Sequence, residues 1–113
     1  MPLVDLEKHD NLGMIRLNNG PTNAIGPDLV QDFSQVLARV RMNFKGMVLS
    51  GGEKFFSMGF DLPTLLKLDR KNMSAFFYNF NQVVFELATL PVPTCAAVKA
   101  HAIAGGAILM LAC

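Results

Sequence analysis

The sequence predicts an α/β fold, and three observations carry that prediction. A helical stripe of apolar residues between Pro27 and Met42 lies between two short apolar segments, Met14–Leu17 and Gly46–Ser50. This strand–helix–strand order favours a sheet with some parallel pairing. The segment at 46–50 has no polar alternation, which is typical of a strand that is covered on both faces. A second amphipathic helix and an extended segment, Thr94–Val98, follow it.

A β-hairpin is the first predicted element. Residues 3–8 alternate Leu3, Asp5 and Glu7 with Val4, Leu6 and Lys8, a pattern that suits an edge strand. Asn11 and Gly13 mark the turn, and Met14–Leu17 forms the returning strand. A loop at Asn18–Pro21 closes the hairpin and leads towards the first helix.

Two amphipathic helices follow. The first begins at Gly26–Asp28, where Pro27 suits the first helical position and Asp28 suits the positive end of the helix dipole. We expect Asn72 or Ser74 to cap the second. Each helix has an apolar stripe along one face, which core packing explains. The stripe consists of Leu29, Val30, Phe33, Val36, Leu37 and Val40 in the first helix, and of Met73, Phe76, Phe77, Phe80, Val83, Val84 and Leu87 in the second.

Composition limits the class of protein. The 113 residues suffice for one domain, and 51% of them are hydrophobic, with a mean hydropathy of +0.33. Lys99 and His101 interrupt the longest apolar run, so we expect a soluble cytoplasmic protein without a membrane span, an organelle matrix being the other compartment considered. Ten basic and nine acidic residues leave a net charge of +1, so the sequence as a whole lacks the excess of positive charge that nucleic-acid binding requires.

The last helix has no polar face and no cap, which indicates a piece of a larger domain or a helix buried in an oligomer.

The two cysteines indicate neither a disulfide nor a metal site. Cys95 and Cys113 lie in apolar segments without the spacing of metal ligands. We expect both to be small buried side chains in a reducing compartment, and we expect no metal.

The Ala104–Gly106 corner is the stretch around which the chain is organised. It joins an extended segment that ends near Val98 to an apolar helix that begins near Gly105. A helix N-terminus leaves backbone N–H groups unpaired, and small residues would expose them to a ligand oxygen. The glycines could equally serve close packing of the chain. The loop at 51–62 also follows an apolar strand, so the two loops are candidates to meet in one cleft.

Side-chain chemistry is sparse. The nucleophile-elbow, zinc-protease and phosphate-loop motifs are absent from the sequence. His101 could act as a general base, although a structural role is favoured. Asp61 could be catalytic, although a capping role is favoured. The charged residues of 67–71 are expected to be a solvated surface rather than a rim for a phosphorylated ligand.

Several motifs together resemble the crotonase superfamily, which includes enoyl-CoA hydratases and isomerases. They are Met14–Asn18, Gly20–Ala24, Lys54–Leu62, Pro91–Pro93 and Ala102–Ala107, in the family's order and spacing. The resemblance covers the whole chain and implies that residues 1–113 are the N-terminal portion of a crotonase-like ββα superhelix, truncated before its end. It implies binding of an acyl-CoA thioester, no cofactor besides the CoA of the substrate, and assembly as a homo-trimer or a pair of trimers.

The resemblance also assigns site residues. By motif position, the two oxyanion-hole N–H groups fall on Met58 and Gly105, which would stabilise a thioester enolate. Thr22 and Ala24 fall on the loop that passes along the adenine and pantetheine of CoA. The remaining expected substrate contacts are Gly59, Asp61 and Gly106.

Ile108 narrows the expected reaction. In hydratases of this superfamily a carboxylate usually stands three residues after the oxyanion-hole glycine, and an aliphatic side chain there cannot activate water. The Ala104–Ile108 corner looks more like that of Δ3,Δ2-enoyl-CoA isomerases, which use one later carboxylate. We expect that carboxylate beyond Cys113, so this segment alone would be inactive. The alternatives are a hydratase, another crotonase reaction such as hydrolysis or decarboxylation, and a non-catalytic acyl-CoA-binding or oligomerisation homologue.

Overall fold

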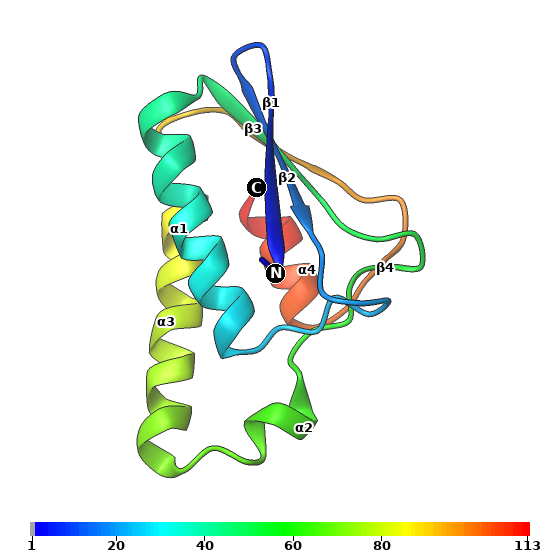
Figure 1. Cartoon of the computed structure of the whole chain (residues 1–113), viewed down its shortest axis with the longest axis vertical. Coiled ribbons are helices and arrows are strands. Elements are labelled where there is room, and N and C mark those ends of the chain that lie inside the picture. The colour runs from blue at the N-terminus through cyan, green and yellow to red at the C-terminus, as the bar shows by residue number, and fades with distance from the viewer. Residues whose placement is uncertain (1) are drawn as a thin grey trace.

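A computed structural model describes residues 2–113 and shows two β-sheets with four helices (Figure 1). The larger sheet has the strand order β1-β2-β3-β5, and the smaller one pairs β4 with β6. The strands are β1 (Val4–His9), β2 (Leu12–Leu17), β3 (Gly46–Ser50), β4 (Phe55–Ser57), β5 (Thr94–Ala97) and β6 (His101–Ala102). The helices are α1 (Pro27–Asn43), α2 (Leu62–Leu65), α3 (Arg70–Ala88) and α4 (Gly105–Ala112).

The topology confirms the predicted α/β class. β1 and β2 form an antiparallel hairpin with β1 at the edge of the sheet. β2, β3 and β5 run parallel to one another, with α1 as the crossover between β2 and β3. Because the carboxyl ends of parallel strands share one edge, the loops after β2, β3 and β5 gather at that edge.

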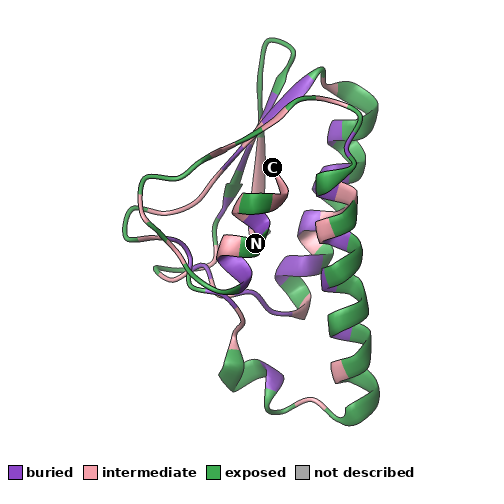
Figure 2. Cartoon of the chain, turned by 180° about the vertical axis from the view of Figure 1, so that it is seen from behind, coloured by how far each residue is buried: buried purple, intermediate pink, exposed green. Residues whose placement is uncertain are grey.

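Helices α1 and α3 run side by side along one flank (Figure 1). The six predicted apolar residues of α1 are all buried, and Pro27 occupies its first turn. The buried residues of both helices face inward, while their outer faces are exposed (Figure 2).

The start of α3 differs from the prediction. Its cap is Asp69, whose Oδ1 accepts a hydrogen bond from the Asn72 amide at 2.8 Å, so neither Asn72 nor Ser74 caps it. The helix therefore begins at Arg70 and takes part of the predicted charged patch into its first turn. Its buried stripe is also narrower than predicted, because Phe77 is 44% exposed.

Strands β4 and β6 were not predicted. With three and two residues they are too short to show a period in the sequence. Each gains its backbone partner from the other, far along the chain. In the described part of the chain, no helix is long and apolar enough to cross a membrane.

Helix α4 is only partly covered. Gly105, Gly106 and Leu109 are buried, whereas Ile108 is 45% and Leu111 77% exposed. The entirely apolar composition of this helix therefore leaves apolar surface facing solvent in the described chain.

The expected burial of both cysteines is wrong for Cys95. β5 is the edge strand of the larger sheet opposite β1, and its side chains alternate between half-buried and exposed, which places Cys95 on the exposed side. Cys113 is half-buried, and burial raises its pKa to about 11, with a smaller contribution from Cys95.

This difference predicts two-phase thiol labelling. At pH 8 we expect one equivalent of a thiol reagent to react rapidly at Cys95 and the second slowly, because the thiolate is the nucleophile and a pKa of about 11 leaves Cys113 protonated. Raising the pH towards 11 should accelerate the slow phase. The Cys95→Ser variant should lose the fast phase, and equal rates at the two thiols in the folded protein would contradict the assignment.

Candidate functional site

A cleft of about 750 Å³ opens where β2, β3 and β5 end. The loop after β2 contributes Gly20, Pro21 and Asn23 to its lining. Three cationic residues, Arg16, Lys54 and Lys99, line it with a single acidic residue, Glu53. The cleft is therefore suited to an anionic ligand that lies along glycine-rich backbone.

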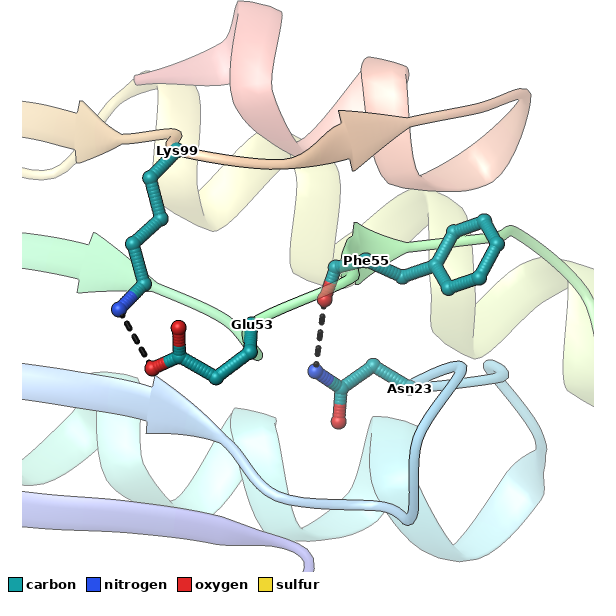
Figure 3. Close-up of polar contacts among 4 residues, drawn as sticks. All are labelled: Asn23, Glu53, Phe55 and Lys99. Carbon is teal, nitrogen blue, oxygen red and sulfur yellow. Dashed lines mark hydrogen bonds and ion pairs between the residues drawn. The ribbon is translucent and has the colours of Figure 1, made fainter.

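Asn23 anchors the loop after β2. It is 1% exposed and has a φ of 49°, a left-handed conformation that asparagine tolerates better than most residues. Its Oδ1 accepts a hydrogen bond from the Asn19 amide at 2.7 Å, and its Nδ2 donates to the Phe56 carbonyl at 3.1 Å. A longer contact of 3.4 Å joins Nδ2 to the Phe55 carbonyl (Figure 3). One buried amide thus ties this loop to β4.

Ser57 continues the same network towards the second loop. Its side chain is fully buried, and its Oγ donates to the Asn23 carbonyl at 2.8 Å. The same Oγ accepts a hydrogen bond from the Gly59 amide at 3.2 Å. The hydroxyl therefore fixes the backbone immediately before Phe60.

The third segment is the Ala104–Gly106 corner, which packs directly against the other two. A Cβ placed on Gly106 would lie 2.3 Å from the Ser57 carbonyl oxygen, so only glycine fits there. A Cβ on Gly59, whose φ is +97°, would lie 3.3 Å from the Gly105 nitrogen. The packing role considered for Gly106 is confirmed. The predicted contact between the two loops is confirmed as well, whereas the Ala104–Gly106 corner does not line the cleft at the strand ends.

The backbone hydrogen bonds correct the role predicted for Met58. Its N–H already donates to the Thr22 carbonyl at 2.9 Å and is not open to a ligand. By contrast, the Phe60 and Gly105 N–H groups have no acceptor within residues 2–113. Phe60 is bridged in parallel to Ile25 through the flanking Gly59 carbonyl and Asp61 amide. Its own N–H therefore points away from Ile25.

Ala104 stores backbone strain beside these amides. Its φ of 50° and ψ of −117° form a combination that residues with a Cβ rarely adopt. The ψ angle of Ala104 orients the peptide group that carries the Gly105 N–H. Gly106, next along, donates to the Ile103 carbonyl at 2.9 Å. The strained residue thus precedes two successive amides, of which that of Gly105 is open and that of Gly106 is engaged.

The side chain of Phe60 is held by an aromatic cluster. Its ring lies 5.1, 5.6 and 5.0 Å from those of Phe76, Phe77 and Phe80 on α3, in edge-to-face geometry. A Cβ on Gly105 would touch the Phe60 ring at 3.2 Å. The ring therefore places the Phe60 backbone next to the corner. Sequence reasoning missed Phe60, Ser57 and Asn23, because their roles depend on partners in distant segments.

The other predicted residues lie around this core. The carbonyls of Thr22 and Ala24 accept hydrogen bonds from the Met58 amide and from Asn19 Nδ2, respectively, so both stabilise the loop. Asp61 caps α2, since its carboxylate accepts from the Thr64 amide and, at 2.7 Å, from Thr64 Oγ1, which confirms the favoured interpretation.

His101 and the charged patch lie outside the corner. The His101 side chain is exposed, with its ring 5.7 Å from that of Phe55, and it lines a second, more open cleft. Lys67, Asp69, Arg70 and Lys71 are exposed, and none of them lines either cleft, in agreement with a solvated surface.

Comparison with known proteins gives a consistent result. The family model described as "Enoyl-CoA hydratase/isomerase" matches residues 7–113. Enoyl-CoA delta isomerase 3 of Arabidopsis thaliana is 33% identical over 115 residues, covering 96% of this chain and 48% of the relative. A probable enoyl-CoA hydratase, EchA17, of Mycobacterium bovis is 32% identical over 104 residues, covering 89% and 40%.

Solved structures match the fold throughout. DspI of Pseudomonas aeruginosa superimposes with a TM-score of 0.92 at 26% identity, covering all of this chain and 48% of that one. An enoyl-CoA hydratase from Bacillus anthracis superimposes with a TM-score of 0.90 at 24% identity, covering 98% of this chain and 45% of that one. At this identity the match shows the shared fold. The chain spans about half the length of the curated relatives it matches first.

The contact between Gly106 and Ser57 generates a stability prediction. Gly106→Ala should lower the free energy of unfolding by about 1–3 kcal/mol, because the new methyl group meets backbone that cannot rotate away. Gly105→Ala is the matched control, since the atoms nearest to its Cβ belong to the side chains of Phe60 and Ile25, which can adjust, and this substitution should cost less. Urea unfolding measures both, and a Gly106→Ala variant as stable as the parent would refute the packing argument.

Proposed function

Because this chain belongs to the enoyl-CoA hydratase/isomerase family, we propose that it binds an acyl-CoA thioester and stabilises the enolate form of its acyl group. The observation that carries the proposal is the pair of N–H groups of Phe60 and Gly105, which have no acceptor within residues 2–113 and belong to segments in direct contact. Two such donors can hold one thioester oxygen.

The proposed chemistry follows from where charge develops. When a proton leaves the carbon next to the thioester, negative charge moves onto the thioester oxygen. Donors already in place stabilise that charge without reorganising, and removing one donor of this kind typically costs about 2.7–4 kcal/mol of barrier. Gly105 also begins α4, whose N-terminus carries partial positive charge. In this proposal Phe60 replaces Met58 beside Gly105.

The CoA portion of the ligand would occupy the cleft at the strand ends. The loop after β2 and the Gly51–Gly52 segment present backbone there, and Arg16, Lys54 and Lys99 present positive charge. Phosphate groups favour such surroundings. Thr22 and Ala24 do not line this cleft and would act by holding the loop through their carbonyls, while Gly59 and Gly106 allow the close approach of the two amide-bearing segments.

Ile108 favours the Δ3,Δ2-enoyl-CoA isomerase among the family's reactions. It lies in the first turn of α4, is 45% exposed, and can neither activate water nor carry a proton. Asp61 is engaged as the cap of α2. A single carboxylate outside these 113 residues would then move the proton between C2 and C4. That relatives are named enoyl-CoA delta isomerases supports this choice, and a relative named as a hydratase keeps hydration as the alternative.

A non-catalytic acyl-CoA binder is the second candidate, favoured by the same apolar residue at position 108. For either function we propose a homo-trimer or a pair of trimers, which the exposed apolar side chains of α4 support. The names of three relatives include the word "peroxisomal". We therefore propose an organelle matrix as a compartment to be tested beside the cytoplasm.

The oxyanion proposal is tested by removing one N–H. Gly105→Pro deletes the donor at the first helical position, where proline is tolerated, and Gly105→Ala adds a Cβ while keeping the donor. With an acyl-CoA bound to the parent and to Gly105→Ala, we expect the thioester C=O stretching band to move to lower frequency. In Gly105→Pro most of that shift should vanish. Binding without a band shift in the parent protein would contradict the proposal.

The reaction is tested with two substrates. In a form of the protein that includes the later carboxylate, we expect 3-enoyl-CoA to become the 2-enoyl isomer, without addition of water to 2-enoyl-CoA. For residues 1–113 alone we expect ligand binding without turnover. Hydration of 2-enoyl-CoA would select the hydratase, and binding without either reaction in the longer form would select the non-catalytic binder.

A further inference from the structure

An ion pair bridges the two loops that flank the cleft. Lys99 Nζ lies 2.7 Å from Glu53 Oε1, and the two residues belong to the β5–β6 and β3–β4 connections (Figure 3). Their side chains are 64% and 86% exposed. Because exposed ion pairs contribute little to stability, this contact can exchange for another partner at low cost.

The ion pair lies where two clefts meet, so it can affect ligand binding in both. The cleft at the strand ends and the second cleft, of about 710 Å³, share Glu53, Lys54, Val98 and Lys99 in their linings. The ion pair therefore lies on the wall common to both clefts. A ligand that extends from one cleft into the other must pass beside it.

The charges around the pair are unbalanced. Arg16, Lys54 and Lys99 line the first cleft, whereas Glu53 is its single acidic residue. The hydrogen bond from Lys99 is the main cause that lowers the pKa of Glu53, with a smaller contribution from Arg16. The carboxylate of Glu53 is therefore paired with a cation that an anionic ligand could also bind.

We propose that Glu53 is an internal competitor for the phosphate groups of the ligand, holding Lys99 until a phosphate displaces it. The inference rests on the proposed function, since it takes CoA as the ligand. In the free protein the carboxylate of Glu53 stands in for a ligand phosphate and links the two loops. When the ligand binds, Lys99 changes partner, and the link between the loops is released.

Neutralising the competitor tests the inference. Glu53→Gln should bind CoA roughly three- to tenfold more tightly than the parent at low ionic strength, as expected for removal of one charge a few ångströms from a phosphate. The gain should shrink as salt increases. Acyl-pantetheine, which has no phosphate, should bind the two proteins equally. Isothermal titration calorimetry measures each affinity.

Two further variants make the outcome specific. Asp10→Asn removes the same charge at the hairpin turn, where φ is 55° and asparagine is tolerated, and it should leave CoA affinity unchanged. In a Lys99→Gln background the gain from Glu53→Gln should be smaller, because the competition is for Lys99. CoA affinity unchanged or weakened in Glu53→Gln would overturn the inference alone. Failure of the parent to bind CoA or acyl-CoA would instead overturn the proposed function.

Discussion

The contact between Ser57 and Gly106 is the constraint on which the candidate site depends. It leaves no room for a side chain at position 106, and it brings the start of α4 against β4. The Ser57 carbonyl also accepts the Ile103 amide at 3.0 Å, while its hydroxyl links Asn23 to Gly59. A single small residue thus joins three loops that are far apart in the sequence, and its burial protects these hydrogen bonds from exchange with water.

This arrangement explains why some amides are engaged and others open. The loop after β2 pairs with one side of the Met58–Asp61 backbone, which takes up the N–H groups of Met58 and Asp61. The N–H of Phe60 alternates to the other side, as it must in an extended strand. There it meets the corner, where the strained Ala104 directs the Gly105 amide. Backbone donors without a protein acceptor are costly unless a ligand or water satisfies them, and the proposed function gives these two donors such a partner.

The charged side chains of the cleft differ from the backbone amides in how they would hold a ligand. The amides of Phe60 and Gly105 are held in place by the contact of Gly106 with Ser57 and by the packing of the Phe60 ring on α3, whereas the cations at the strand ends are carried by exposed side chains that can change partner. Rigid donors suit the atom where charge develops during a reaction, and mobile cations suit ligand groups that only need to be held. The two parts are joined through the loop after β2, because Asn23 lines the cleft and also bonds to β4.

The sequence by itself determined the α/β class, the hairpin, the crossover helix and the meeting of the two glycine-rich loops. Each of these follows from local periodicity, turn chemistry or the rule that parallel strands end at one edge. It also indicated the capping role of Asp61, since the side chain and the amide it accepts are three residues apart. The predicted cap of α3 was wrong because Asp69 and Asn72 have similar capping propensities, and only the local geometry selects between them. Tertiary structure alone decided that Phe60 rather than Met58 has an open amide, that Cys95 is exposed, and that Glu53 faces Lys99. A hydrogen-bond partner, an exposed strand face and an ion pair all depend on residues distant in the sequence, and no local pattern encodes them.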